Sequence, residues 1–256
     1  MIHATALVHP GARLAADVEV GAYSIIGEHV EIGPGTVVGP HVVINGHTRI
    51  GAHNRIFQFC SLGEIPQDMK YANEPTGLEI GDHNTIREFC TFNLGTVQDA
   101  GTTRLGDHNW IMAYVHLAHD CQVGNHTIMA NGATLGGHVH VGDWAFLGGL
   151  SGVHQFVRIG AHAMTGFQTR LSQDLPHYVT AADNPAAVHG INSEGLKRRG
   201  FSGASIMAIK RAYKTLYKSG LSLEEATAAL RSQAEECAEL QPLVDFLAAS
   251  TRGIIR

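Results

Sequence analysis

The sequence HLAHDCQVGN (116–125) places two histidines and an aspartate among small and apolar residues. A histidine next to a carboxylate is suited to general base catalysis, because the carboxylate can fix the tautomer of the imidazole ring. The same residue types bind zinc, and His116, His119 and His138 could in principle converge on a metal ion. No cysteine or carboxylate completes a regular ligand set around them, so the sequence favours a catalytic base over a metal site.

Two further segments carry side chains suited to a phosphorylated sugar. The segment QDMKYANEPT contains Asp68 and Lys70, which together could hold a sugar hydroxyl and a phosphate. The segment GLKRRGF contains Lys197, Arg198 and Arg199, and arginine is suited to bidentate phosphate contacts. A solvated helix end is the alternative for at least one of these three basic residues.

Aliphatic residues recur at every sixth position through most of the chain, and small or β-branched residues precede them by two positions. Six residues are too few for a helical repeat. A short strand and a corner per hexapeptide, with three hexapeptides to a triangular coil, fit the pattern and predict a parallel β-helix. Thr165 is the one member of the aliphatic series that is not apolar. The series runs from Ile2 to Leu62, from Ile80 to Phe92 and from Leu105 to Leu171.

The repeat divides the chain into two predicted parts. Residues 1–190 form the β-helix, and residues 191–256 form a C-terminal α-helical domain that covers its open end. The repeat is interrupted near residues 64–79 and 94–104, where polar side chains replace the expected core residues. A regular solenoid accommodates insertions as outward loops, and function concentrates on such loops.

Three helices are predicted in the C-terminal part. The first lies within residues 201–220, where apolar residues share one helical face and Gly220 ends the helix. Ser222 and Glu225 form a capping box for a second helix from 223 to about 240. Pro242 opens a third helix that continues to residue 251.

The stacking of coils singles out His119. Three hexapeptides after it stands Gly137, followed by His138, so a bare backbone N–H should lie one coil away from the His119 ring. A general base beside an oxyanion donor has this arrangement. His154 lies nearly two coils away on the same side. Asp120 follows His119 directly, and strand alternation alone would point its side chain elsewhere.

Composition excludes several classes of protein. The net charge of −5 gives no reason to expect nucleic acid binding. The N-terminus has no basic region followed by an apolar run, so no signal peptide is predicted. No apolar stretch is long enough to span a bilayer. The cysteines form no CxxC pair, which favours free thiols in a reducing cytoplasm; they are Cys60, Cys90, Cys121 and Cys237.

Five segments of the chain, including its helical end, resemble the UDP-N-acetylglucosamine 3-O-acyltransferases that begin lipid A synthesis in the cytoplasm. The final segment and the first loop are specific to this family among hexapeptide acyltransferases. The segments are VVINGHTRIG (42–51), GEIPQDMKYANEPT (63–76), HLAHDCQVGN (116–125), GVHQF (152–156) and NSEGLKRRGFS (192–202).

The resemblance implies a homotrimer of left-handed parallel β-helices, an exception to the usual handedness of parallel crossovers. It places the active sites in clefts between subunits. The donor would be a 3-hydroxyacyl group on acyl carrier protein, and basic residues near the cleft suit this acidic partner. The acceptor would be UDP-N-acetylglucosamine. No cofactor is expected, since the donor thioester is already activated.

The resemblance also implies roles for individual residues. His119 matches the general base that deprotonates the sugar 3-hydroxyl, Asp120 matches its partner, and the Gly137 amide matches the oxyanion donor. Substrate contacts match Asp68, Lys70, His116, His138, His154 and Gln155. The nucleotide-binding stretch matches Asn192, Glu194 and Arg198, and Arg199 beside them completes the expected substrate-binding set.

The chain departs from the family at two positions. Many relatives carry a His-Arg pair where this sequence has Asn93 and Leu94, so Asn93 must replace a sugar contact or that contact is lost. Phe167 occupies the position that floors the acyl groove, where long-chain members carry glycine. A phenyl ring there predicts a short donor, nearer ten carbons than fourteen.

Other functions remain open from the sequence alone. An N-acyltransferase of the same pathway or a coenzyme A-dependent acetyltransferase would share the repeat, but the NSEGLKRRGF segment argues against both. A zinc lyase of the carbonic anhydrase type would use the same histidines. A non-catalytic scaffold would not explain why polar loops and a basic cluster accompany His119. An acceptor with a 3-amino group in place of the hydroxyl also remains open.

Overall fold

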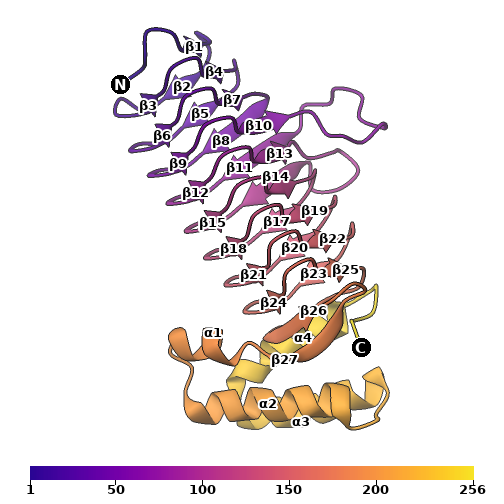
Figure 1. The fold of residues 1–256 in the computed structure, drawn as a ribbon. Coiled ribbons are helices and arrows are strands. Elements are labelled where there is room, and N and C mark those ends of the chain that lie inside the picture. The colour runs from indigo at the N-terminus through magenta and orange to yellow at the C-terminus, as the bar shows by residue number, and fades with distance from the viewer.

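The computed structural model describes residues 1–256 as a β-helix of triangular coils followed by a helical domain (Figure 1). Successive coils stack through parallel strand pairs, so that each side of the triangle becomes one long sheet. The fold is a left-handed parallel β-helix, which confirms the predicted fold class.

Three sheets make up the sides of the β-helix. The first sheet contains β1 (Leu7–Val8), β4 (Ile25–Ile26), β7 (Val43–Ile44), β10 (Ser61–Glu64), β13 (Thr91–Asn93), β16 (His116–Leu117), β19 (Thr134–Leu135), β22 (Gly152–Val153) and β25 (Arg170–Leu171). The second sheet contains β2 (Arg13–Leu14), β5 (Glu31–Ile32), β8 (His47–Ile50), β11 (Gly77–Ile80), β14 (Thr102–Leu105), β17 (Gln122–Val123), β20 (His140–Val141) and β23 (Arg158–Ile159). The third sheet contains β3 (Glu19–Val20), β6 (Val37–Val38), β9 (Arg55–Ile56), β12 (Thr85–Ile86), β15 (Trp110–Ile111), β18 (Ile128–Met129), β21 (Phe146–Leu147), β24 (Met164–Thr165), β26 (Val179–Ala182) and β27 (Ala187–Ile191).

The chain turns a corner between each pair of sheets. We call the corner between the first and second sheets corner I, that between the second and third corner II, and that between the third and first corner III. Both interruptions of the hexapeptide repeat project from corner I, because they connect β10 to β11 and β13 to β14. Figure 1 shows these two loops side by side on one edge of the β-helix. The same corner carries the turn between β16 and β17, which contains His119.

The predicted aliphatic series fills the interior. Its members pair in register with the residues of neighbouring coils, as Ile26 does with Ile44, and most of them are fully buried. Thr165 is also buried, and its hydroxyl accepts a hydrogen bond from Gly148 N–H at 2.9 Å, which explains a polar residue in the apolar column. The three cysteines at small-residue positions are buried free thiols, as expected for packing residues: Cys60, Cys90 and Cys121.

Corners II and III carry columns of stacked rings in the left-handed backbone conformation. Such a conformation is uncommon for residues other than glycine. Here each ring packs face to face with the ring one coil away, at centroid distances such as 4.1 Å between His126 and Trp144. The column at corner II contains His53, His83, His108, His126, Trp144 and His162, and the column at corner III contains Tyr23, His41, Phe59, Phe89 and Tyr114.

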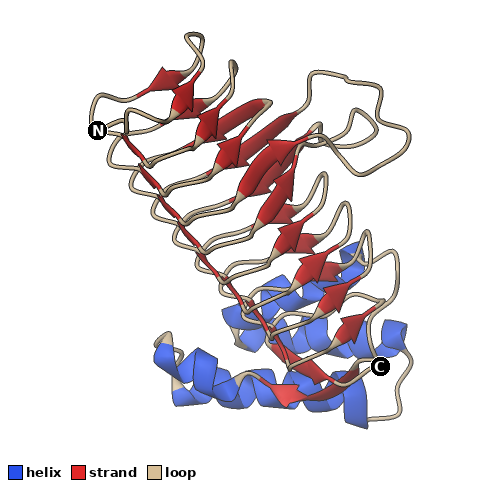
Figure 2. Cartoon of the chain, turned by 45° about the horizontal axis from the view of Figure 1, so that its top comes forward, coloured by secondary structure: helices blue, strands red, loops and turns tan.

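The helices pack together at the last coil (Figure 2). They are α1 (Ser193–Arg198), α2 (Gly203–Lys218), α3 (Leu223–Glu236), a short 3₁₀ helix (Ala238–Leu240) and α4 (Gln241–Ala249). The capping box of Ser222 and Glu225 is present at the start of α3. That helix ends at Glu236 rather than near residue 240, because Cys237 adopts an extended backbone. The hairpin of β26 and β27 and the helix α1 were not predicted from the sequence.

Candidate active site

His119 and Asp120 lie side by side at corner I, directly after β16. The Nδ1 atom of His119 is 2.9 Å from Oδ2 of Asp120. The expectation that strand alternation would separate the two side chains was wrong, because both residues lie in the turn and Asp120 has a left-handed backbone with φ of 60°. This contact fixes the neutral imidazole with its proton on Nδ1 and leaves a lone pair on Nε2.

The Asp120 carboxylate is completely buried and is held by the loop that joins β13 to β14. Thr96 donates to it from the backbone N–H at 3.0 Å and from Oγ1 at 2.6 Å. The backbone N–H of Asp120 in turn donates to Oγ1 of Thr103 at 2.8 Å. A buried carboxylate is tolerated only with such partners. Sequence reasoning missed Thr96 and Thr103, although both lie in or beside the predicted loop.

Gly137 lies against the His119 ring, as the coil period predicted. A Cβ atom built on Gly137 would be 2.5 Å from Cε1 and 2.6 Å from Nε2 of His119, so only glycine fits at this position. The Gly137 N–H donates to no protein acceptor. An unpaired donor therefore stands beside the nitrogen that can act as a base.

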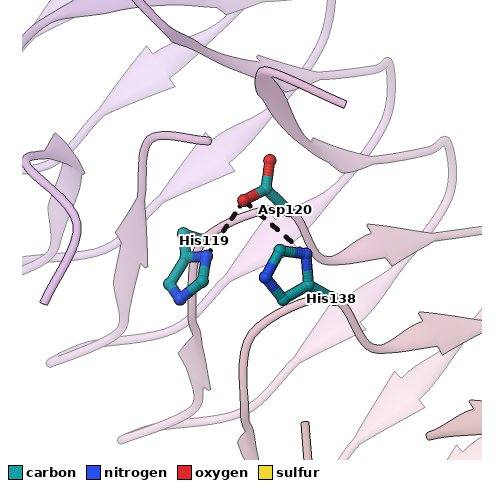
Figure 3. Close-up of side chains that lie close together, drawn as sticks. All are labelled: His119, Asp120 and His138. Carbon is teal, nitrogen blue, oxygen red and sulfur yellow. Dashed lines mark hydrogen bonds and ion pairs between the residues drawn. The ribbon is translucent and has the colours of Figure 1, made fainter. Parts of the chain in front are cut away.

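His138 joins the same cluster one coil further along (Figure 3). Its ring meets that of His119 edge to face at a centroid distance of 4.8 Å. Its Nδ1 atom lies 2.6 Å from Oδ2 of Asp99 and 3.8 Å from Oδ2 of Asp120. Asp99 comes from the same loop as Thr96, and no sequence pattern had singled it out.

His116 precedes this cluster on β16. Its Nδ1 atom lies 2.7 Å from Oγ1 of Thr91 on the neighbouring strand. Burial lowers the pKa of His116, a hydrogen bond with the Thr91 backbone partly opposes this effect, and His119 lowers the pKa further. His116 is therefore neutral at pH 7 and suited to hydrogen bonding rather than to charge pairing.

A surface pocket of about 460 Å³ opens beside His138. It brings Asp68 and Lys70 of the first loop together with His138. The rest of the lining comes from the second loop, from β20 and β23 of the second sheet, from the turn before β23 and from the segment after α4: Thr96, Gln98, Asp99, His140, Arg158, Phe156 and Thr251. We call this cavity the Lys70–His138 pocket. His154 and Gln155 lie exposed at corner I and do not line it, although Gln155 belongs to the same column of coil positions as His119 and Gly137.

A larger hollow of about 730 Å³ lies on the outer face of the second sheet. Its lining includes the ion pairs of Glu79 with Arg49 and Arg104, at 3.3 and 2.6 Å. It contains no histidine, cysteine or serine. The hollow is therefore a charged sheet face.

The side chains of His119, Asp120 and His138 could also hold a metal ion, since their ligand atoms lie within 4.8 Å of one another. The prediction that no carboxylate completes such a set was wrong, because Asp120 Oδ2 lies near the Nδ1 atoms of both rings. The same carboxylate oxygen already accepts a hydrogen bond from Thr96 and faces both Nδ1 atoms. A metal ion would have to replace these contacts.

Comparison with known proteins places the chain in a family. Residues 174–255 match the family described as UDP-N-acetylglucosamine O-acyltransferase, domain 2, and residues 102–137 match the bacterial transferase hexapeptide repeat. A protein of Thiobacillus denitrificans named acyl-[acyl-carrier-protein]–UDP-N-acetylglucosamine O-acyltransferase is 67% identical over 255 residues, which cover 100% of this chain and 99% of the relative. The chain belongs to this acyltransferase family.

Solved structures of family members share the whole fold. LpxA from Acinetobacter baumannii has 48% sequence identity and a TM-score of 0.98, and the match covers 100% of this chain and 99% of that one. The UDP-N-acetylglucosamine O-acyltransferase of Moraxella catarrhalis has 46% identity and a TM-score of 0.98, with the same coverage. As an acyltransferase of this family, the chain is an enzyme. None of its helices is both long and apolar enough to cross a bilayer.

The residues of this chain that were predicted to bind the nucleotide lie beside corner II, not corner I. Asn192 caps α1 by accepting from Gly195 N–H at 3.1 Å and donates to the backbone oxygen of His162 at 3.0 Å. The Arg199 guanidinium packs over the Trp144 ring at 5.2 Å and contacts His162 Nδ1 at 3.2 Å. The single chain therefore does not bring these residues together with His119.

Glu194 and Arg198 belong to the same helix. Glu194 is exposed and pairs with Lys197 at 2.8 Å, which supports the solvated helix end that was kept as an alternative for one basic residue. Arg198 forms no ion pair within the chain. Lys197 and Arg199 each contact another side chain of the chain, whereas Arg198 is exposed and contacts none.

The two departures from the family pattern have structural consequences. Asn93 is buried, and its amide donates to the backbone oxygen of Ile65 at 3.0 Å, so it anchors the base of the first loop. Phe167 is 66% exposed at corner III, and a Cβ atom built on Gly149 would lie 3.1 Å from its ring. Phe167 thus lies at a different corner from His119. The predicted nucleotide-binding residues on and beside α1 are likewise separated from His119.

Proposed function

We propose that the chain transfers a 3-hydroxyacyl group from acyl carrier protein to the 3-hydroxyl of UDP-N-acetylglucosamine, the first step of lipid A biosynthesis in the cytoplasm. One arrangement carries the proposal. The His119 ring is held by the Asp120 carboxylate and lies against Gly137, whose N–H donates to no acceptor within the chain. Full-length identity of 67% to a relative of that name supports the choice of substrates.

The proposed reaction is a sequence of proton transfers. Nε2 of His119 takes the proton of the sugar 3-hydroxyl while the hydroxyl oxygen attacks the thioester carbonyl. The Gly137 N–H stabilises the oxyanion of the tetrahedral intermediate. The intermediate collapses to the ester and expels the thiolate of the carrier, which takes the proton from the His119 imidazolium. Asp120 stabilises that imidazolium, and the thioester requires no further activation by a cofactor.

Substrate contacts are assigned to two groups of residues. Asp68, Lys70 and His138 share one pocket, which suits the sugar and its phosphates. The remaining contacts on corner I are His116, His154 and Gln155.

The second group comprises Asn192, Glu194, Arg198 and Arg199, which are proposed to bind the nucleotide. They lie beside corner II, so they reach a His119 site only from a neighbouring subunit. This separation supports a homotrimer whose active sites lie between subunits. Mixing subunits with His119→Ala and subunits with Arg198→Ala should then restore activity above that of either variant alone. An unchanged rate after subunit exchange would contradict a shared site.

Phe167 is proposed to shorten the acyl groove, so that a ten-carbon donor is preferred over a fourteen-carbon donor. The exposed ring on corner III is available to a groove formed with a neighbouring subunit. Equal turnover of the two carrier-bound chains, or a preference for the longer one, would contradict this assignment.

The direct test uses the purified chain with UDP-N-acetylglucosamine and carrier-bound 3-hydroxyacyl groups of several lengths, with mass spectrometry of the product. An O-acylated sugar nucleotide supports the proposal. A product only from the 3-amino analogue of the sugar, or only from acetyl coenzyme A, would assign the chain to another acyltransfer reaction. A metal-dependent lyase has one observation in its favour, the His119–Asp120–His138 cluster. About one bound zinc per subunit, with activity lost on chelation, would support that alternative.

A further inference from the structure

The loop between β13 and β14 supplies a second carboxylate to the site. Asp99 lies on this loop, and its Oδ2 atom is 2.6 Å from Nδ1 of His138. The two residues are 39 positions apart in the sequence, so the insertion at corner I reaches past the coil of His119 to the coil of His138. The site therefore holds two carboxylate–histidine pairs, one of which the proposed mechanism does not use.

The His138 ring is held from several sides. Phe156 stacks on it with a centroid distance of 4.3 Å and an interplanar angle of 3°. Its side chain is 11% exposed. Both nearby carboxylates, those of Asp99 and Asp120, face Nδ1 rather than Nε2. The position of the ring is thus set by stacking, whereas its tautomer is set by the carboxylates.

The tautomer decides what His138 can bind. With the proton of the neutral ring on Nδ1, the Nε2 atom is a hydrogen-bond acceptor. Figure 3 shows this second nitrogen on the side of the ring toward His119. A group that donates to it would lie beside the proposed base. Without Asp99 the ring could take the other tautomer, in which Nε2 donates instead of accepting.

We propose that Asp99 is a positioning residue for the acceptor sugar. It holds the Nδ1–H of His138 so that Nε2 accepts a hydrogen bond from a hydroxyl or amide N–H of a sugar that extends from the Lys70–His138 pocket toward His119. The inference rests on the proposed function, because it assumes that a sugar nucleotide occupies this pocket. Asp99 touches none of the reacting atoms of the mechanism and acts through His138.

The test is a double-mutant cycle on the full-length enzyme with UDP-N-acetylglucosamine and its acyl carrier donor. Asp99→Ala should raise KM for the sugar nucleotide about fivefold, the effect of one hydrogen bond between neutral groups, and leave kcat and KM for the donor nearly unchanged. In a His138→Ala background the same substitution should change kcat/KM by less than about twofold, because its effect passes through His138. Asp99→Asn keeps an acceptor and should recover most of the loss.

Asp17→Ala is the matched control, since Asp17 is an exposed aspartate that accepts one hydrogen bond, from Gly35 N–H at 3.0 Å, at the far end of the β-helix. An equal loss from Asp99→Ala in both backgrounds would overturn the proposal, as would a fall in kcat with unchanged KM for the sugar nucleotide. Wild-type turnover without any effect of Asp99→Ala would overturn it while leaving the proposed function intact. Absence of wild-type turnover would instead overturn the proposed function itself.

Discussion

Gly137 lies directly beneath the imidazole of His119, one coil further along the β-helix, and any side chain at residue 137 would occupy the space of the ring. Gly137→Ala should therefore displace the proposed base or the oxyanion donor and lower kcat/KM about a hundredfold. Gly203→Ala is the control, because a Cβ atom there meets nothing within 4 Å. Steady-state rates at matched folded concentration check this, and equal rates for the two variants would show that the close approach is not needed.

Removal of the proposed base should lower kcat more than any other single substitution. A positioned base contributes about 10²–10⁴ in rate, so His119→Ala should lose at least about a hundredfold in kcat while its thermal unfolding stays close to that of the wild type. His189→Ala provides the comparison, since His189 is an exposed histidine that also pairs with an aspartate, Asp183, at 2.7 Å. Near-normal turnover by His119→Ala would remove His119 from the mechanism.

The hydroxyl of Thr96 holds the buried Asp120 carboxylate at 2.6 Å. Thr96→Val keeps the shape of the side chain but removes this donor, so the free energy of unfolding should fall by roughly 1.5–3 kcal/mol and kcat should fall with it. Thr96→Ser keeps the donor and should retain most of both. Denaturant unfolding and kcat are measured for both variants. Identical unfolding free energies and kcat values for Thr96→Val and Thr96→Ser would contradict a role for the hydroxyl.

The exposed ring of Phe167 should set the length of the acyl chain. Phe167→Gly opens the space that the ring occupies, so the ratio of kcat/KM for the fourteen-carbon donor to that for the ten-carbon donor should rise by at least about tenfold, because each buried methylene contributes ~0.8 kcal/mol. Phe59→Gly removes an exposed ring from the same corner at a distant coil and should leave the ratio unchanged. Competition between the two carrier-bound donors measures the ratio directly. No change in Phe167→Gly would mean that another residue limits the groove.

Acid should weaken the junction between the β-helix and the helical domain, where the His177 ring packs edge to face against Phe246 of α4 at a centroid distance of 5.2 Å. Burial, with smaller contributions from His162 and Arg158, lowers the pKa of His177 to about 4. An unfolded histidine titrates near 6.5, so the unfolded chain takes up a proton first, and stability is complete above about pH 6.5 and is lost as the pH falls toward 4. At pH 4.5 the loss from this one residue is about 2 kcal/mol.

His177→Asn should remove that part of the pH dependence, because asparagine can still accept from Ala161 N–H, as Nδ1 of His177 does at 3.0 Å. Unfolding free energies at pH 7 and pH 4.5, measured at one protein concentration, give the comparison. An identical decrease in the wild type and the variant would contradict this account.

Much of the fold follows from the sequence because its pattern is local and periodic. An aliphatic residue at every sixth position specifies the interior of a triangular coil whatever the neighbouring coils contain, and Thr165 fits since a nearby backbone donor satisfies its hydroxyl. The juxtaposition of His119 and Gly137 followed from the same arithmetic. The helical ends were less well predicted, as with α3, because a single extended residue, Cys237, ends the helix.

The tertiary structure alone decided how the site is held. Asp120 reaches His119 because a left-handed turn replaces strand alternation, and such a turn is stabilised by contacts with Thr96 and Thr103, which lie where the repeat is interrupted near residues 94–104. Asp99 reaches His138 across 39 residues for the same reason, since an inserted loop has no period from which its path can be read. The repeat determined which residues stack from coil to coil. The packing of two irregular loops against corner I determined which side chains of the site contact one another.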